Sequence, residues 1–295
     1  MGELRLPSHL GPGGFDHGDV HQPTGRVFIA HTANGTVEVV DGPQLRHVAT
    51  ISDCPEASGV LCSPDGGAVI AAARGAGHIL LIDPSSLEVR AKVVVGGRPN
   101  GLAWDSRRRR VLVADVAGDS ISIVDAQDGQ VLTTTGLPGR PRWAVYDHDR
   151  DRYLVNVRTP SVVAVIAAET GAVVTQWQVS SEGPHGLDLD LPSNRALVAC
   201  DGGRVVALDL STGAEVGSVP IAGGPDAIWF DGASARLFVA IGKPGAIQVV
   251  NTLTLSVDET VECALGTQTT ALDKLRRRLY LFEPGSGSVL AFSLL

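Results

Sequence analysis

The sequence predicts an all-β fold, a β-propeller of seven four-stranded antiparallel blades, and three observations support this prediction. First, a short apolar run recurs every 42 residues, as VEVVD, ILLID, ISIVD, VAVIA, VVALD, IQVVN and VLAFS. Second, each repeat contains four short strand-like runs, which in the third copy are GLAWD, RVLVADV, SISIVDA and QVLTTTG. Third, the chain has 35 glycines and only 4% aromatic residues, a composition typical of short strands joined by tight turns. Four strands in a repeat of this length are typical of a propeller blade.

The repeats divide residues 1–295 into one domain of seven blades, which begin near residues 14, 55, 97, 139, 182, 223 and 265. We label the predicted strands of a blade A to D, from the channel outwards. The turn after strand C contains polar residues and glycine, as in DAQDG, DLSTG and AAETG, and glycine readily adopts the positive φ of a tight turn. The seventh copy ends with VLAFSLL, its strand C, and ELRLPSHL stands before the first copy. Since natural proteins avoid open sheet edges, we predict that Glu3–His9 forms the outer strand of the last blade and closes the ring.

Charge and composition exclude several function classes. The formal net charge is −8, which disfavours a general nucleic-acid or anionic-membrane surface. Two arginine runs, Arg107–Arg110 and Arg276–Arg278, lie between strand-like runs and are interpreted as solvated hairpin turns. The four cysteines show no zinc spacing, no run approaches 18 apolar residues, and the N-terminus lacks the pattern of a signal peptide. We therefore expect a soluble, cytoplasmic protein with no nucleic-acid or membrane partner.

The repeat pattern also carries a family resemblance. GRPNGLAWDSRRRRVLVADVAGDSISIVD, from Gly97 to Asp125, resembles the YVTN-repeat, lactonase-like seven-bladed propellers, and the resemblance covers residues 12–295. It implies the propeller fold without choosing one activity. That superfamily includes lactonases, lyases, haem and metal enzymes, and proteins with no known chemistry.

Polar residues of unlike chemistry gather at one mouth of the predicted channel. Antiparallel neighbours place the start of strand A and the end of strand B at the same mouth. The aligned repeats put one polar residue of each blade at the start of strand A, and we call this set the mouth ring: Asp16, Ser58, Asn100, Arg142, His185, Asp226 and Gln268. The ends of strand B contribute a second, partly polar set: His31, Ala73, Asp115, Val157, Cys200, Ile241 and Glu283. Arg74, Arg158 and Asp201 directly follow their members of this second set.

The mouth ring has a structural and a functional interpretation. Polar residues there can simply face the water that fills the channel. Charged residues in neighbouring blades favour a site, because a narrow concave surface makes unpaired charges costly. In the functional interpretation Arg142 holds a substrate carboxylate, His185 moves a proton and Asp226 fixes the imidazole tautomer. The residues predicted to bind the rest of the substrate are Asn100, Gln268, Ser58, Arg74, Arg158, Asp115 and Trp143.

Blade one is irregular and suggests a metal site. It reads FDHGDVHQPTGRVFIAH, with three histidines within 15 residues. His17 and His31, together with Asp16 or with Glu283 of blade seven, would offer ligands for Zn²⁺, Fe²⁺ or Mn²⁺. The spacing matches no established metal motif, and His21 is expected a strand length away from the mouth.

A second resemblance also bears on metal binding. PNGLAWD and PDAIWFD resemble the Asn and Asp metal-ligand strands of the gluconolactonase/regucalcin propellers, which implies that Asn100 and Asp226 ligate a divalent metal. Those proteins have six blades, and their blade-one Glu corresponds here to Asp16 or His17. Their second Asn ligand has no clear counterpart.

These observations lead us to expect a small-molecule enzyme of the hydrolase (lactonase-like) or lyase type. It would act at the mouth on a polar or anionic metabolite, with a divalent metal ion as the one cofactor considered. GxSxG, Walker, HExxH, CxxCH and dinucleotide motifs are absent, so no nucleotide, flavin or haem is expected. The alternative is a non-catalytic binding or scaffold protein whose propeller face docks a protein partner. It predicts a flat mouth with exposed aromatic residues, and Trp143, in a column of mostly small residues, favours it.

Overall fold

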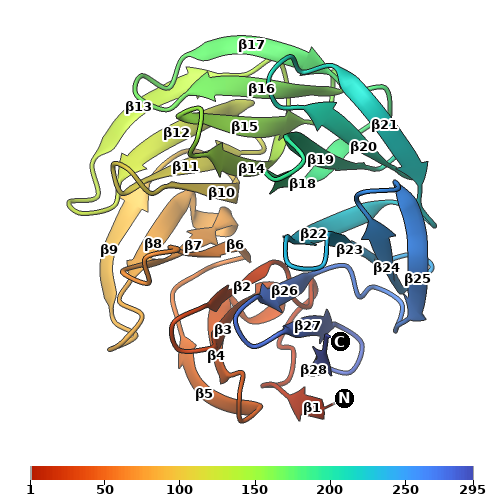
Figure 1. Cartoon of the computed structure of the whole chain (residues 1–295). Coiled ribbons are helices and arrows are strands. Elements are labelled where there is room, and N and C mark those ends of the chain that lie inside the picture. The colour runs from red at the N-terminus through yellow and green to blue at the C-terminus, as the bar shows by residue number, and fades with distance from the viewer. Residues whose placement is uncertain (1, 295) are drawn as a thin grey trace.

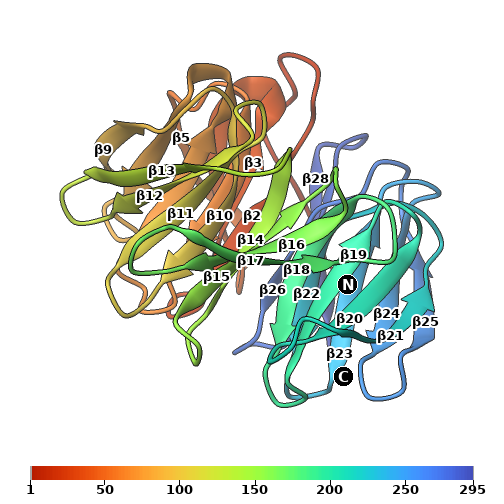
Figure 2. The same ribbon diagram turned by 90° about the horizontal axis from the view of Figure 1, so that it is seen from above.

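The computed structural model describes residues 2–294 and confirms the predicted all-β fold. Seven four-stranded antiparallel sheets surround a central channel, and the two ends of the chain lie side by side in the same blade (Figure 1). A view turned by 90° shows the sheets as separate layers around the ring (Figure 2). No helix in the described residues is long and apolar enough to cross a membrane.

Blades one to six each consist of four consecutive strands, the first at the channel and the last at the outer rim. Blades one and two contain β2 (Gly18–His21), β3 (Arg26–His31), β4 (Thr36–Asp41), β5 (Arg46–Ile51), β6 (Ala57–Cys62), β7 (Val69–Ala73), β8 (His78–Ile82) and β9 (Val89–Val94). Blades three and four contain β10 (Pro99–Asp105), β11 (Arg110–Asp115), β12 (Ser120–Asp125), β13 (Val131–Gly136), β14 (Pro141–Asp147), β15 (Arg152–Val157), β16 (Val162–Ala167) and β17 (Val173–Gln178). Blades five and six contain β18 (Pro184–Asp190), β19 (Arg195–Cys200), β20 (Arg204–Asp209), β21 (Glu215–Pro220), β22 (Pro225–Asp231), β23 (Arg236–Ile241), β24 (Ala246–Asn251) and β25 (Ser256–Glu262). Blade seven contains β26 (Thr270–Asp273), β27 (Arg278–Glu283), β28 (Ser288–Ser293) and β1 (Gly2–Arg5). Two short 3₁₀ turns, η1 (Thr32–Asn34) and η2 (Arg74–Ala76), follow the second strands of blades one and two.

The N-terminal strand closes the ring, as predicted. β1, Gly2–Arg5, pairs antiparallel with β28 and is the outer strand of blade seven. The observed strand is shorter than the predicted one, Glu3–His9. Leu6 donates its N–H to the carbonyl of Gly287 at 2.9 Å, and Pro7 has no N–H with which to continue the ladder.

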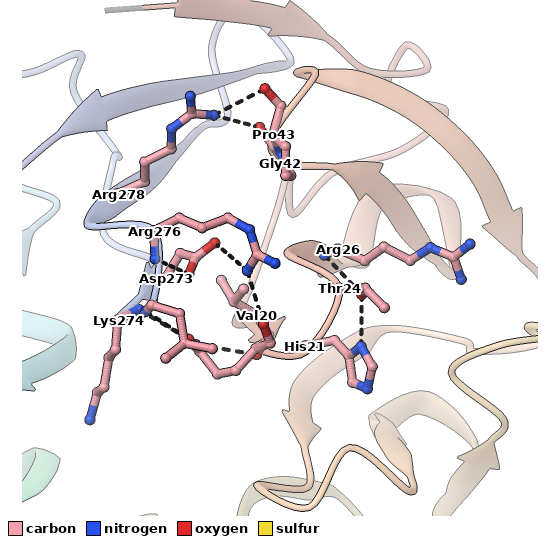
Figure 3. Close-up of polar contacts among 12 residues, drawn as sticks. Val20, His21, Thr24, Arg26, Gly42, Pro43, Asp273, Lys274, Arg276 and Arg278 are labelled. Carbon is pink, nitrogen blue, oxygen red and sulfur yellow. Dashed lines mark hydrogen bonds and ion pairs between the residues drawn. The ribbon is translucent and has the colours of Figure 1, made fainter.

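Arginine side chains strengthen the junction between blades seven and one. Arg276 Nη1 donates to the carbonyl of Gln22 at 2.9 Å, and Arg278 Nη1 donates to that of Gly42 at 3.0 Å (Figure 3). Both belong to the run Arg276–Arg278, of which the first two residues lie in the predicted turn and Arg278 begins β27. The run is therefore not merely solvated, because two of its side chains hold the backbone of the neighbouring blade.

The hydrophobic core lies between neighbouring blades. Phe28 and Val39 of blade one pack with Val69 and Leu80 of blade two, and all four side chains are fully buried. Seven such clusters follow each other around the ring, one for each pair of neighbours. Each sheet thus buries both faces. This arrangement leaves the innermost strands to line the channel.

Candidate functional site

A β-bulge at the mouth sets the ring residues apart from the rest of the inner strand. In blades two to six the pairing register shifts between Ala57 and Val60, Pro99 and Leu102, Pro141 and Ala144, Pro184 and Gly186, and Pro225 and Ile228. Five mouth-ring residues lie inside these bulges: Ser58, Asn100, Arg142, His185 and Asp226. Because a bulge inserts an unpaired residue and re-aims a side chain, the same local irregularity presents five different residues at the mouth.

Glycine follows the ring residue where the next blade approaches closely. A Cβ on Gly59 would lie 2.0 Å from the carbonyl oxygen of Asn100, and one on Gly101 would lie 2.0 Å from that of Arg142. No side chain fits at these places. Trp143 occupies the corresponding place in blade four, and its ring lies edge-on to that of His17 with 4.5 Å between the centroids. Trp143 therefore projects into the channel and packs against a polar residue of the site.

His185 is the centre of the site. Its side chain is buried, and its Nδ1 lies 2.9 Å from Oδ1 of Asp201. Its Nε2 lies 3.0 Å from Nε of Arg142 and 3.1 Å from Oδ1 of Asp226. The three residues predicted to act together are thus in contact. The carboxylate at Nδ1, however, belongs to Asp201 and not to Asp226, so Asp201 is the residue that keeps a proton on Nδ1.

The two partners of Nε2 favour different protonation states of His185. A neutral imidazole accepts the N–H of Arg142, whereas an imidazolium donates to Asp226. Burial lowers the pKa of His185, but the charge of Asp226 and the hydrogen bonds to Asp201 and Asp226 outweigh burial and raise it. Burial likewise opposes ionisation of Asp226, yet the charges of His185, His17 and Arg142 hold its pKa well below the usual range. Protonation of Nε2 therefore exchanges one hydrogen bond for another, which suits a general acid or base.

A second polar group lies beside the first. His17 Nε2 is 3.3 Å from Oδ1 of Asp16 and 3.6 Å from Oδ1 of Asp226, so Asp226 is shared by two histidines. Arg74 Nη1 is 3.1 Å from Oδ2 of Asp16. A cavity of about 10 Å³, comparable to one water-sized sphere, is enclosed by His17, Asn100, Gly101, Arg142, Trp143 and His185.

Two guanidinium groups at the mouth have no carboxylate partner. Arg158 is paired with Asp201 at 2.7 Å. Arg140 and Arg142 form no ion pair with a carboxylate within residues 2–294. Burial and the positive charge of Arg142 lower the pKa of Arg140, which places the two groups within electrostatic reach of each other. Arg140 is exposed and Arg142 is half-buried beside His185, so both guanidinium groups are open to an anionic ligand.

Three residues predicted to bind substrate have other partners or lie at the rim. Ser58 is fully buried and donates to the carbonyl of Pro99 at 3.0 Å. Asp115 accepts the backbone N–H of Arg98 at 2.8 Å and those of three further loop residues. Gln268 is exposed. The first two side chains hold the loops around the mouth and are not presented to a ligand.

The four residues predicted to ligate a metal do not gather. His31 Nδ1 lies 3.1 Å from Glu38, and its Nε2 lies 2.7 Å from His9. Glu283 accepts a hydrogen bond from Ser286 at 3.2 Å. No group of three or more His, Cys, Asp or Glu side chains that would hold a metal ion occurs in the described part of the chain.

Sequence reasoning did not assign a role to Asp201 or Arg140. Asp201 directly follows Cys200, the end of the second strand of blade five, and that position was visible in the aligned repeats. Its contact with His185 depends on the bulge, which the repeats do not show. Arg140 lies two residues before the ring residue of blade four, outside both aligned sets.

Comparison with known proteins supports the fold. No protein-family model and no curated protein sequence matches the chain. Among solved structures, Kuenenia stuttgartiensis hydrazine synthase matches with a TM-score of 0.87 and 15% identity, over 98% of this chain and 97% of that chain. A chain of the mitotic checkpoint complex matches with a TM-score of 0.84 and 14% identity, over 99% of this chain and 90% of that chain. At such low identity the likeness shows the propeller fold alone.

Proposed function

We propose that this protein is an enzyme of the hydrolase or lyase type that acts on a small anionic metabolite at the mouth of the channel. The observation that carries the proposal is the 2.9 Å contact between His185 Nδ1 and Asp201. It orients the imidazole and leaves Nε2 as the atom that exchanges a proton. The lactonase-like appearance of the repeats agrees with this reaction class.

Substrate binding and proton transfer are coupled through Arg142. Arg140 and Arg142 would hold the anionic group of the substrate. When the guanidinium of Arg142 turns toward that anion, it no longer donates to Nε2 of His185. In a hydrolase, Nε2 takes a proton from the water that attacks an ester carbonyl and returns it to the departing alkoxide. In a lyase, Nε2 takes a proton from the carbon beside the carboxylate while the group on the next carbon leaves. Asp226 stabilises the imidazolium in both cases.

The test is a screen of tag-free protein against lactones, hydroxy acids and unsaturated acids. Binding is measured by calorimetry and turnover by pH-stat or ultraviolet absorbance. We expect at least one compound to bind and turn over, Arg142→Gln to weaken its binding about tenfold or more, and Asp201→Asn to lower kcat by roughly 10²-fold or more. His148→Gln is the matched control, because His148 is exposed and its nearest carboxylate is Asp149 at 2.9 Å. Binding without turnover, or equal turnover in Asp201→Asn, would contradict an enzymatic role.

A further inference from the structure

A larger cavity occupies the channel below the mouth ring. Its volume is about 250 Å³, larger than the roughly 150 Å³ that holds a benzene molecule in a protein core. The inner strands of blades one to six line it. Three of the four tryptophans of the chain contribute to its wall: Trp104, Trp143 and Trp229. Only 4% of the residues are aromatic, yet three tryptophans line this one cavity. A channel that holds only water does not need such an aromatic lining.

Two carboxyl groups line the same cavity. Asp19 of blade one and Asp188 of blade five stand three residues after the mouth ring in their repeats, and Trp229 of blade six occupies the same position. The three residues therefore lie at a similar depth. Asp19 Oδ2 accepts the N–H of Cys62 at 2.8 Å, and Asp188 Oδ2 accepts that of Phe230 at 2.7 Å. Both carboxyl groups are thus held in place by the backbone of the next blade.

The negative charge of these carboxyl groups is poorly compensated. Neither Asp19 nor Asp188 forms an ion pair with a described residue. Burial raises the pKa of both carboxyl groups, and the charge of Asp188 contributes to the raised pKa of Asp19, which is about 7. Lys274 attracts both carboxylates but does not reach them, and Figure 3 shows its side chain extending away from the neighbouring Asp273. A cation in the cavity would be attracted by the carboxylates of Asp19 and Asp188 and would favour their ionised form.

Three buried polar atoms of the wall have no hydrogen-bond partner within residues 2–294. They are Nδ1 of His17, Oδ1 of Asn100 and Nε1 of Trp104, and each of these residues is only 5% exposed. His17 Nε2 faces two carboxylates, so this nitrogen carries a proton. Unpaired buried polar atoms are rare, so these three leave the wall with unsatisfied hydrogen-bonding capacity.

We propose that the channel cavity binds a small organic ammonium ion with a single ring, its ammonium group lying between Asp19 and Asp188. The ammonium supplies the missing positive charge, and the faces of the nearby indoles attract a cation. The ring fits a volume of about 250 Å³. The ammonium position is distinct from the His185–Asp201 pair, although His17, Asn100 and Trp143 line both cavities, and the proposal does not rest on the proposed reaction.

Calorimetry with three phenolic compounds tests this proposal. They differ in the group at the end of the side chain, which is an ammonium in tyramine, a hydroxyl in tyrosol and a carboxylate in 4-hydroxyphenylacetate. We expect tyramine to bind with a 1:1 stoichiometry, tyrosol to bind at least tenfold more weakly, and the anion not to bind. Asp188→Asn should weaken tyramine binding at least tenfold. The control Asp258→Asn removes an exposed carboxylate and should bind as the wild type does.

A second variant guards against a folding defect in Asp188→Asn. Val145 lines the cavity at the same depth in blade four, so Val145→Lys places a tethered ammonium there and should abolish tyramine binding. Far-UV circular dichroism checks the fold of each variant. No tyramine binding, equal affinity for tyrosol, or wild-type affinity in folded Asp188→Asn would overturn the proposal. Loss of tyramine binding in Asp201→Asn would also overturn it, because the amine would then bind at the mouth.

Discussion

The Glu38→Gln substitution removes a carboxylate that is fully buried in blade one. Glu38 accepts hydrogen bonds from Thr36 at 2.7 Å and Thr50 at 2.6 Å. Its other contacts are Nδ1 of His31 at 3.1 Å and Nε2 of His47 at 2.8 Å. Burial alone would raise the pKa of Glu38, but these four hydrogen bonds together lower it from 4.5 to about 2. The ionised carboxylate of Glu38 therefore stabilises the folded chain.

The lowered pKa determines both the size and the pH dependence of the effect. A carboxyl group with a lower pKa in the folded than in the unfolded chain stabilises the fold above its unfolded pKa. That contribution disappears as the pH falls toward the folded pKa. A drop from 4.5 to about 2 corresponds to about 3 kcal/mol at neutral pH. We expect Glu38→Gln to lower the free energy of unfolding by about this amount at pH 7 and by progressively less below pH 4.5.

Urea unfolding at pH 7, 5 and 3.5 measures this difference. The control is Glu215→Gln, which removes an exposed glutamate of β21 and should change the free energy of unfolding by no more than about 0.5 kcal/mol. The reasoning is refuted if Glu38→Gln is as stable as the wild type at pH 7, or if its loss of stability is the same at all three pH values.

Three further predictions concern the ring and the mouth. Deleting residues 2–5 leaves the edge of β28 unpaired. Size-exclusion chromatography should then show aggregation, and thermal unfolding should show a lower Tm. A monomer with an unchanged Tm would contradict closure by β1. Gly101→Ala places a Cβ 2.0 Å from a carbonyl oxygen of blade four, so urea unfolding should show a loss of about 1–3 kcal/mol in the free energy of unfolding. The control Gly136→Ala, which has no atom within 4 Å of the added Cβ, should be as stable as the wild type. Equal stabilities of the two variants would show that the strands can move apart. Asp226→Asn removes the charge that does most to raise the pKa of His185, so the imidazole should titrate at lower pH in an NMR titration, and an unchanged midpoint would argue against their coupling.

The fold was predictable from the sequence because every blade repeats the same physical pattern. Residues at one phase of the 42-residue period, such as Asp41 and Asp125, end equivalent strands, and each strand alternates in the same way. Closure by the N-terminus followed from the unpaired edge of the last copy. The end of the closing strand was not predicted, since the missing N–H of Pro7 has its effect only once the partner strand is known.

The mouth ring was also visible in the repeats, but the contacts within it were not. Arg142, His185 and Asp226 meet because they stand in consecutive blades at equivalent bulges. Asp201 reaches Nδ1 of His185 from a loop of the same blade, and no periodic pattern reports that contact. Glu38 is similar, because the strand pattern VEVVD does not show that histidines of the neighbouring strands bury its carboxylate.

The central claim is that His185 transfers a proton during turnover at the mouth, and steady-state kinetics of His185→Gln test it most directly. The substrate is the best compound from the screen, and His148→Gln is measured beside it. We expect His185→Gln to lower kcat by roughly 10²–10⁴-fold while KM changes less than about tenfold. Equal kcat values for the two variants would contradict it.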